Sequence, residues 1–147
     1  MIVYVDTSAL VKLFVREEGS DEVFRWIAEA DIVSTALIAY AEARAALARR
    51  WRLADLPPSR LPGVVRALDE QWPSFLAVEI TRDLVTKAGN LAERHALRGY
   101  DAVHLAAALE YGRLSSSKVT FVAYDDRLSL AALAEGLDVR GRLPGAA

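Results

Sequence analysis

The sequence predicts a single α/β domain over residues 1–147, a three-layer α/β/α arrangement with a central parallel sheet of four to five strands. Two observations predict this class. Short apolar segments alternate with longer segments of helical periodicity along the whole chain, which is typical of a parallel sheet with helices on both faces. The segments 2–5 and 119–124 are also almost continuously apolar, as expected of strands that are buried on both faces.

Composition narrows the class of protein. A chain of 147 residues is long enough to bury about two-thirds of its unfolded surface as one domain. Its net charge of −2 provides no general basic field for nucleic acid, so only a local patch would serve. The absence of cysteine fits a reducing cytoplasm. No apolar run approaches the ~20 residues of a membrane span, and no signal peptide is apparent, so we expect a cytoplasmic protein without a membrane partner.

The expected elements follow from hydrophobic periodicity and from turn and cap residues. Expected strands cover residues 2–5, 31–34, 75–80 and 119–124, with 138–140 as a short edge strand. Expected helices cover residues 9–18, a segment from 20 onward, 36–52, 61–72, a segment from the Thr81 cap to about 97, 100–113 and 128–135. We expect Thr7 or Ser8 to cap the first helix and Gly19 to end it. The prolines at 57, 58 and 62 indicate a loop.

Two acids directly follow the two most apolar strands. Asp6 follows residues 2–5, and Asp125 follows residues 119–124. The carboxyl ends of parallel strands share one edge of the sheet, and ligands of open α/β proteins bind at that edge. We therefore expect the two carboxylates to lie on the same edge. The alternative is that each acid only caps the next helix or forms a turn, with Asp126 as the partner of Asp125.

Glu42 lies in the middle of the helix expected at 36–52. The apolar side of that helix is expected to carry Ile38, Ala41, Ala45 and Ala48. Glu42 points along this side, where an acid is costly unless it is paired, hydrogen-bonded or bound to metal. The alternative is a glutamate at the margin of the stripe that pairs with Arg49 or Lys12.

Asp101 opens a nearly apolar helical segment at residues 101–109. Such a helix is expected to be buried, so its first turn is expected to be partly buried as well. An acid in a first turn also serves as a partner of the helix dipole, which is the simpler explanation for Asp101 alone. His104 lies one turn further on, and we expect a hydrogen-bonded histidine that supports the site rather than a metal ligand.

Four carboxylates from four segments, without matching cysteines or histidines, favour a hard cation that prefers oxygen ligands. Mg²⁺ fits this donor set, Mn²⁺ is expected to substitute for it, and Zn²⁺ does not fit. Metal sites of this kind typically act on phosphoryl groups. The four acids are Asp6, Glu42, Asp101 and Asp125.

The ordered motifs resemble a PIN-domain nuclease, in particular the VapC toxins of type II toxin–antitoxin pairs. The motifs are Asp6-Thr7-Ser8-Ala9-Leu10, then Glu42, then Asp101-Ala102-Val103-His104-Leu105, then Tyr124-Asp125-Asp126-Arg127-Leu128. The resemblance implies that Asp6, Glu42, Asp101 and Asp125 bind the metal. It also implies supporting roles for neighbouring polar groups, among which we count Thr7, Ser8, His104 and Asp126. The family often has Thr or Ser two residues before its last acid, where this chain has Ala123.

The resemblance further implies an endoribonuclease that hydrolyses RNA phosphodiesters, forms a homodimer and is inhibited by a cognate antitoxin protein whose tail blocks the site. Arg44, Arg49 and Arg50, with Trp51 among them, are candidates for RNA contacts through charge and stacking. A solvated helix face is the simpler explanation for most of these arginines.

Three other functions are open at this stage. A phosphatase of the haloacid-dehalogenase type requires a second Asp two residues after the first, where this chain has Ser8. A receiver domain requires a Lys at the end of a late strand, whereas Lys118 precedes its strand. A PIN-like module that binds RNA or protein without toxin activity is the third alternative, and a metal titration separates it from a nuclease.

Overall fold

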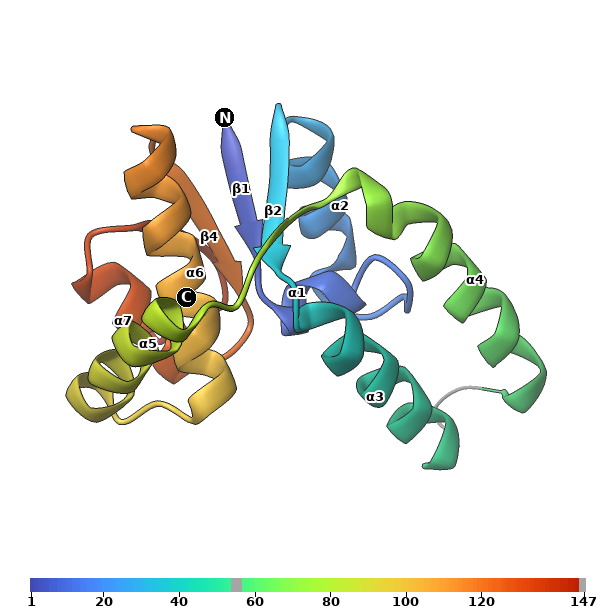
Figure 1. The fold of residues 1–147 in the computed structure, drawn as a ribbon. Helices are drawn as coiled ribbons and strands as arrows, with labels where there is room; N and C mark the ends of the chain where they lie inside the picture. The colour runs from blue at the N-terminus through green and yellow to red at the C-terminus, as the bar shows by residue number, and fades with distance from the viewer. Residues whose placement is uncertain (54–56, 146–147) are drawn as a thin grey trace.

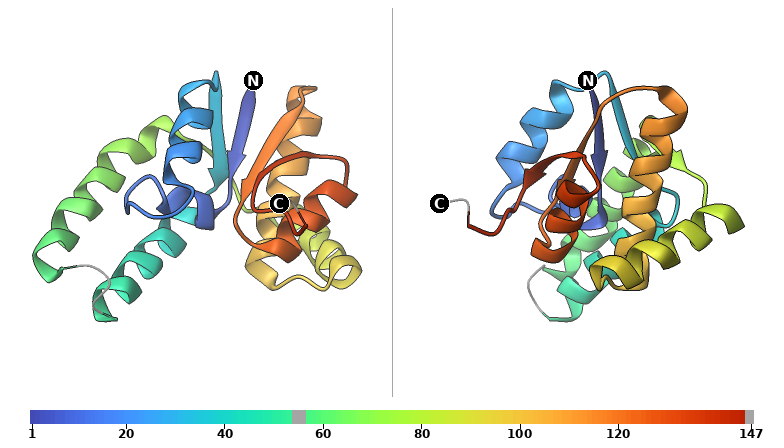
Figure 2. Two further views of the ribbon diagram at one scale, coloured as in Figure 1. Left: turned by 180° about the vertical axis from the view of Figure 1, so that it is seen from behind. Right: turned by 90° about the vertical axis from the view of Figure 1, so that its left-hand side faces the viewer.

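The computed structural model describes residues 1–53 and 57–145 and confirms the expected α/β class. Within these residues, five parallel strands form one sheet in the order β3-β2-β1-β4-β5. The strands are β1 (Ile2–Val5), β2 (Ile32–Ala36), β3 (Leu76–Val78), β4 (Val119–Ala123) and β5 (Asp138–Gly141). Figures 1 and 2 show helices on both sides of this sheet, so the three-layer arrangement is as expected.

Seven α-helices surround the sheet in the described part of the chain. They are α1 (Thr7–Val11), α2 (Ser20–Ala28), α3 (Ala39–Arg52), α4 (Leu61–Gln71), α5 (Arg82–His95), α6 (Gly99–Ser115) and α7 (Asp126–Ala134). Successive side chains of β1 point to opposite faces. Val3 and Val5 pack with α1 and α3, whereas Tyr4 packs with α5, α6 and α7. None of the helices described is long and apolar enough to cross a membrane.

The strand order places β1 beside β4 at the centre of the sheet. The chain proceeds from β1 outward to β3 and then returns to the other side of β1 with β4. Ligands of open α/β sheets bind at such a reversal, outside the carboxyl ends of the strands. The backbone N–H of Asp6 donates to the carbonyl oxygen of Val122 at 3.1 Å, so β1 and β4 end at the same level.

The first helix differs from the expected one. The helix covers only Thr7–Val11, and its N-cap is Asp6 rather than Thr7 or Ser8, because the Asp6 carboxylate accepts the N–H of Ala9. Gly19 does not end this helix but is the N-cap of α2, in a left-handed conformation with φ of 87°.

The buried face of α3 also differs from the expected stripe. Ala39, Ala43 and Leu47 are buried, while Ala41 and Ala45 are exposed. Alanines on all sides of this helix give little amphipathic contrast, so its neighbours α1 and α4 decide which face is buried.

Several boundaries shift by a few residues. β2 reaches Ala36 because Ser34–Ala36 pairs with β3, while β3 itself is shorter than residues 75–80. In the proline-rich connection, a 3₁₀ turn covers Pro58–Arg60 and leads directly into α4. Residues 54–56 of that connection lie outside the described part. α3 and α4 form a helical pair that extends away from the sheet (Figures 1 and 2).

Candidate active site

Asp6 lies at the carboxyl end of β1 and is 4% exposed. Its Oδ1 accepts the backbone N–H of Ala9 at 2.9 Å and the hydroxyl of Ser8 at 2.7 Å. The Ser8 hydroxyl oxygen in turn accepts the backbone N–H of Tyr124 at 2.9 Å, which joins the ends of β1 and β4. Burial raises the pKa of Asp6 to about 6, and the nearby Asp101 carboxylate acts in the same direction.

Asp125 lies two residues beyond the end of β4, because this strand ends at Ala123 rather than at the expected residue 124. Its Oδ1 accepts the backbone N–H of Leu128 at 2.9 Å and so caps α7. Asp126, the first residue of α7, instead pairs with Arg142 at 2.9 Å. Asp125 and Asp126 both line a surface cavity of about 450 Å³ at this edge of the sheet. Asp126 therefore lies close to Asp125, although the two acids have different hydrogen-bond partners.

Arg98 is a residue of the candidate site that the sequence did not predict. It is the residue before α6, and its Nε donates to Oδ2 of Asp101 at 3.0 Å. Its Nη2 lies 3.8 Å from Oδ2 of Asp125, and 81% of the side chain is exposed. The only signal in the sequence is an arginine three residues before an acid at a helix start. This guanidinium connects the acid of α6 to the acid at the end of β4.

Glu42 extends from α3 toward the same edge. Its Oε1 accepts the Thr7 hydroxyl at 2.8 Å and lies 2.7 Å from Nε2 of His104. Lys12, one partner considered for Glu42, pairs with Glu17 instead at 2.9 Å. Burial by itself raises the pKa of Glu42, but the hydrogen bonds from His104 and Thr7 outweigh it and lower the pKa overall. Glu42 is therefore anionic at neutral pH.

His104 connects Glu42 to the core of the sheet. It is 1% exposed, and its Nδ1 lies 2.9 Å from the hydroxyl of Tyr4. Tyr4 is fully buried in β1 and stacks on Phe121 of β4 with 5.4 Å between ring centroids. The sequence predicted a hydrogen-bonded histidine, and the structure places His104 between Tyr4 and Glu42; its supporting role at the site stays a prediction. Tyr4 was not predicted, although it is the only residue of β1 with a polar side-chain group.

The four predicted acids lie at one edge of the sheet, but their hydrogen bonds and ion pairs divide them into three separate groups. Asp6 bonds to Ser8, Glu42 bonds to Thr7 and His104, and Arg98 connects Asp101 with Asp125. Among residues 1–53 and 57–145, no three acidic or histidine side chains converge closely enough to hold a metal ion as they stand. The donors nevertheless fit a hard divalent cation in kind, because they are carboxylate and hydroxyl oxygens from the ends of adjacent elements.

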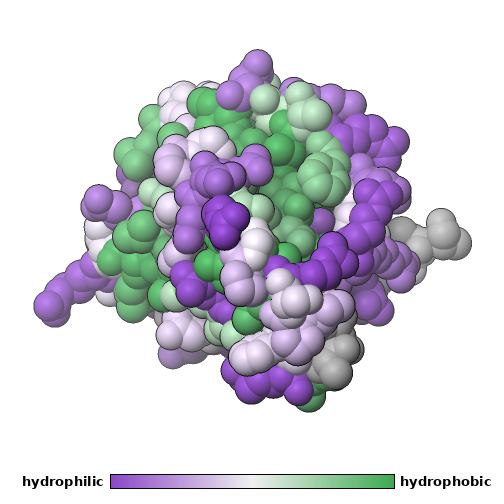
Figure 3. Space-filling view, turned by 90° about the vertical axis from the view of Figure 1, so that its right-hand side faces the viewer, coloured by the Kyte–Doolittle hydropathy of each residue, from purple (hydrophilic) through white to green (hydrophobic). Residues whose placement is uncertain are grey.

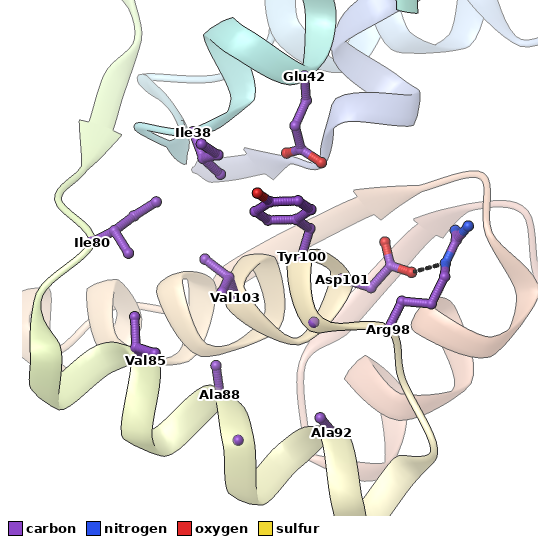
Figure 4. Close-up of a pocket in the computed structure, with 12 residues that line it drawn as sticks. Ile38, Glu42, Ile80, Val85, Ala88, Ala92, Arg98, Tyr100, Asp101 and Val103 are labelled. Carbon is purple, nitrogen blue, oxygen red and sulfur yellow. Dashed lines mark hydrogen bonds and ion pairs between the residues drawn. The ribbon is translucent and has the colours of Figure 1, made fainter. Parts of the chain in front are cut away.

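A largely apolar cavity of about 680 Å³ adjoins these acids. Figure 4 shows Glu42 descending from α3, Asp101 and Arg98 at one end, and the ring of Tyr100 between them and the apolar wall. The apolar wall comprises Ile38, Ile80, Val85, Ala88, Ala92 and Val103. Tyr100 is 60% exposed, so an aromatic surface is accessible beside the carboxylates.

The three arginines proposed for RNA contacts lie on α3. Arg44 donates to the Tyr40 hydroxyl at 2.8 Å, and Arg50 pairs with Glu17 at 2.5 Å, while Arg49 is exposed. Figure 3 views the molecule from the side on which α3 and α4 lie in Figure 1, and it shows hydrophilic and hydrophobic residues interleaved. A role of these arginines in RNA binding stays a prediction.

Comparison with known proteins identifies the family. The family model described as PIN domain matches residues 3–134. The chain belongs to the PIN-domain family. Ribonuclease VapC45 of Mycobacterium tuberculosis is 40% identical over 138 residues, covering 94% of each chain. This PIN domain is therefore also related in sequence to the VapC proteins, as the motifs suggested. The match removes the dehalogenase-type phosphatase and the receiver domain as alternatives.

Solved structures support the same fold. The PIN domain is similar to M. tuberculosis VapC20, which is described as a toxin that cleaves the sarcin–ricin loop. The TM-score is 0.66 at 21% identity, and the match covers 95% of this chain and 99% of that one. It is also similar to a chain from a toxin–antitoxin complex of Klebsiella pneumoniae, with a TM-score of 0.60, 16% identity, and coverage of 95% and 96%.

Proposed function

We propose that this PIN domain is a metal-dependent endoribonuclease and the toxin of a type II toxin–antitoxin pair. The observation that carries the proposal is the arrival of four acids from four elements at the β1–β4 reversal of the sheet. Asp6 and Asp125 follow the two central strands, Glu42 extends from α3, and Asp101 lies in the first turn of α6. The 40% identity to a ribonuclease over nearly the whole chain supports the same activity.

The acids Asp6, Glu42, Asp101 and Asp125 are the proposed ligands of Mg²⁺, for which Mn²⁺ substitutes. When bound, such a metal activates water and stabilises negative charge on a phosphodiester. Thr7 and Ser8 hold the carboxylates of Glu42 and Asp6 by hydrogen bonds, and His104 also holds Glu42. Asp126 contributes negative charge at the rim, where it is paired with Arg142.

Arg98 is the proposed contact for the RNA phosphate. Its guanidinium is largely exposed and lies beside Asp101 and Asp125, so a phosphate placed over these acids also meets a bidentate donor. The exposed Arg49, with Arg44 and Arg50 on the same helix, is the proposed source of further, weaker backbone contacts.

The proposed partners are an RNA substrate, a cognate antitoxin protein and a second copy of this chain in a homodimer. An antitoxin segment with an arginine and apolar side chains suits the acids and the adjoining apolar cavity. The toxin–antitoxin complex from K. pneumoniae is a fold-level precedent for such a partner.

RNA cleavage tests the proposal. The purified protein is incubated with a panel of structured RNAs and Mg²⁺ or Mn²⁺, in parallel with EDTA. We expect discrete cuts that EDTA abolishes and that Asp6→Asn reduces by several orders of magnitude. Cleavage that persists in EDTA and survives Asp6→Asn contradicts the metal mechanism. Binding of RNA without cleavage at any metal concentration favours the alternative, a PIN-like binding module without toxin activity.

A further inference from the structure

Tyr4 is buried in the central strand β1, and the imidazole of His104 connects its hydroxyl to Glu42 at the acidic edge of the sheet. We propose that Tyr4 and His104 are positioning residues: the Tyr4 hydroxyl donates to Nδ1 of His104, Nε2–H of His104 donates to Glu42, and this chain of hydrogen bonds fixes the orientation of the Glu42 carboxylate. The proposal rests on the proposed function, because it assigns to this pair the task of presenting one oxygen of Glu42 to the metal.

The hydrogen-bonding partners determine the tautomer. Oε1 of Glu42 lies 2.7 Å from Nε2 of His104, and an ionised carboxylate can only accept. Nε2 must therefore carry a hydrogen. In a neutral ring Nδ1 is then an acceptor, so the hydroxyl of Tyr4, at 2.9 Å, must donate to it. The chain of donors runs in one direction, from Tyr4 through His104 to Glu42.

The geometry of Glu42 shows what this chain controls. Both the Thr7 hydroxyl and the imidazole are directed at Oε1. Oε2 of Glu42 accepts neither of these hydrogen bonds, so within the described residues it is the oxygen available to another ligand. Rotation of the carboxylate would break two hydrogen bonds, so the orientation is set before any cation arrives. Partners of this kind behind a carboxylate or imidazole typically change metal affinity by about 10- to 100-fold.

Burial and packing keep the donors in place. Tyr4 is fully buried, and its ring is stacked on Phe121 with an interplanar angle of 7°. A buried histidine needs partners at both ring nitrogens, whichever role it has. What distinguishes His104 is the partner of Nε2, which is a half-buried acid at the candidate active site.

Nitrogen-15 NMR of the imidazoles tests the tautomer without metal or RNA. The chain has two histidines, so a His95→Gln variant assigns the signals of His104. We expect wild-type His104 to be protonated at Nε2 and bare at Nδ1. In Tyr4→Phe the Nδ1 acceptor loses its donor, so we expect the Nδ1 signal to shift while Nε2 stays protonated by its contact with Glu42. A proton on Nδ1 in the wild type overturns the proposal.

Binding of Mn²⁺ alone, followed as the rise in melting temperature, tests the consequence for Glu42. We expect Tyr4→Phe and His104→Leu to require roughly tenfold more Mn²⁺ for the half-maximal rise. His104→Gln is the rescue variant, because its amide can donate to Glu42 and its carbonyl can accept from Tyr4. We expect it to need close to the wild-type concentration. Tyr111→Phe, which removes a hydroxyl elsewhere on α6, is the matched control and is expected to change nothing.

The outcomes separate the two proposals. A wild type whose melting does not respond to Mn²⁺ overturns the metal function itself. A wild type that responds, with Tyr4→Phe giving the same Mn²⁺ dependence and an unchanged Nδ1 signal, overturns only the positioning role. If His104→Leu fails to fold, Tyr4→Phe and His104→Gln still decide, since both keep the volume of the buried side chains nearly constant.

Discussion

Asp6 and Asp125 follow neighbouring parallel strands, and each uses Oδ1 to cap the next helix. Capping and metal binding do not exclude each other for these acids, because only one oxygen of each carboxylate caps a helix. One oxygen of each carboxylate accepts the backbone N–H at the start of α1 or α7, and Oδ2 is free of that task. The capping hydrogen bond orients the carboxylate, and this orientation leaves Oδ2 available for the proposed metal.

Asp125 allows the two roles to be measured separately. Asp125→Asn retains an oxygen that can cap α7, because Asn and Asp are similar N-caps. We expect its free energy of unfolding without metal to remain close to that of the wild type. Asp125→Ala lacks the cap and is expected to lose about 1 kcal/mol. Both variants are expected to lose most of the melting-temperature rise caused by Mn²⁺. An Asn variant that keeps the full rise would remove Asp125 from the ligand set.

Gly19 is predicted to be the more sensitive of two left-handed glycines. Gly19 and Gly136 both have φ of 87°, so an alanine at either position carries the same backbone strain of about 1–2 kcal/mol. A Cβ at Gly19 would lie 2.6 Å from the ring of Tyr124, whereas a Cβ at Gly136 meets open space. We expect Gly19→Ala to lower the free energy of unfolding by about 1–3 kcal/mol more than Gly136→Ala, because the ring must move. Equal losses in urea unfolding would show that Tyr124 adapts freely.

The acids at the strand ends were predictable because a buried strand followed by an acid is a local pattern. The choice of cap was not, since Asp6, Thr7 and Ser8 are adjacent and have similar preferences as N-caps. The contact of Tyr4 with His104 spans 100 residues and depends on α6 packing against β1, so no local pattern contains it. The place of Arg98 also depends on tertiary structure, because β4 must bring Asp125 beside the start of α6.

Arg98 is predicted to compete with the metal in the absence of RNA. The Arg98→Gln variant removes the cation between Asp101 and Asp125, so we expect a lower Mn²⁺ concentration at the half-maximal rise in melting temperature. Exposed ion pairs contribute less than about 1 kcal/mol, which limits the change to about fivefold. The effect should shrink in added salt. Arg66→Gln, on the exposed face of α4, is the control. A higher Mn²⁺ requirement in Arg98→Gln would mean that Arg98 supports the metal site instead.

The raised pKa of Asp6 predicts a pH dependence of stability without metal. The pKa is about 6 in the folded protein, against about 3.9 for an unfolded chain, so the folded state binds the extra proton between these values. Protonation therefore favours folding below about pH 4, and this contribution is lost as the pH rises through 6. This difference between the folded and unfolded pKa corresponds to on the order of 3 kcal/mol for a fully buried acid.

Asp6→Asn tests this directly, since it removes the charge and keeps an oxygen for Ala9 and Ser8. We expect the variant to be more stable than the wild type at pH 7 to 8 in EDTA, with the difference closing toward pH 4. Glu93→Gln, an exposed acid on α5, controls for the loss of one negative charge. With Mn²⁺ at pH 7 the order should reverse, because a ligand stabilises only the protein that binds it. A strongly destabilised Asp6→Asn protein that retains the Mn²⁺ response would make Asp6 a helix cap and nothing more.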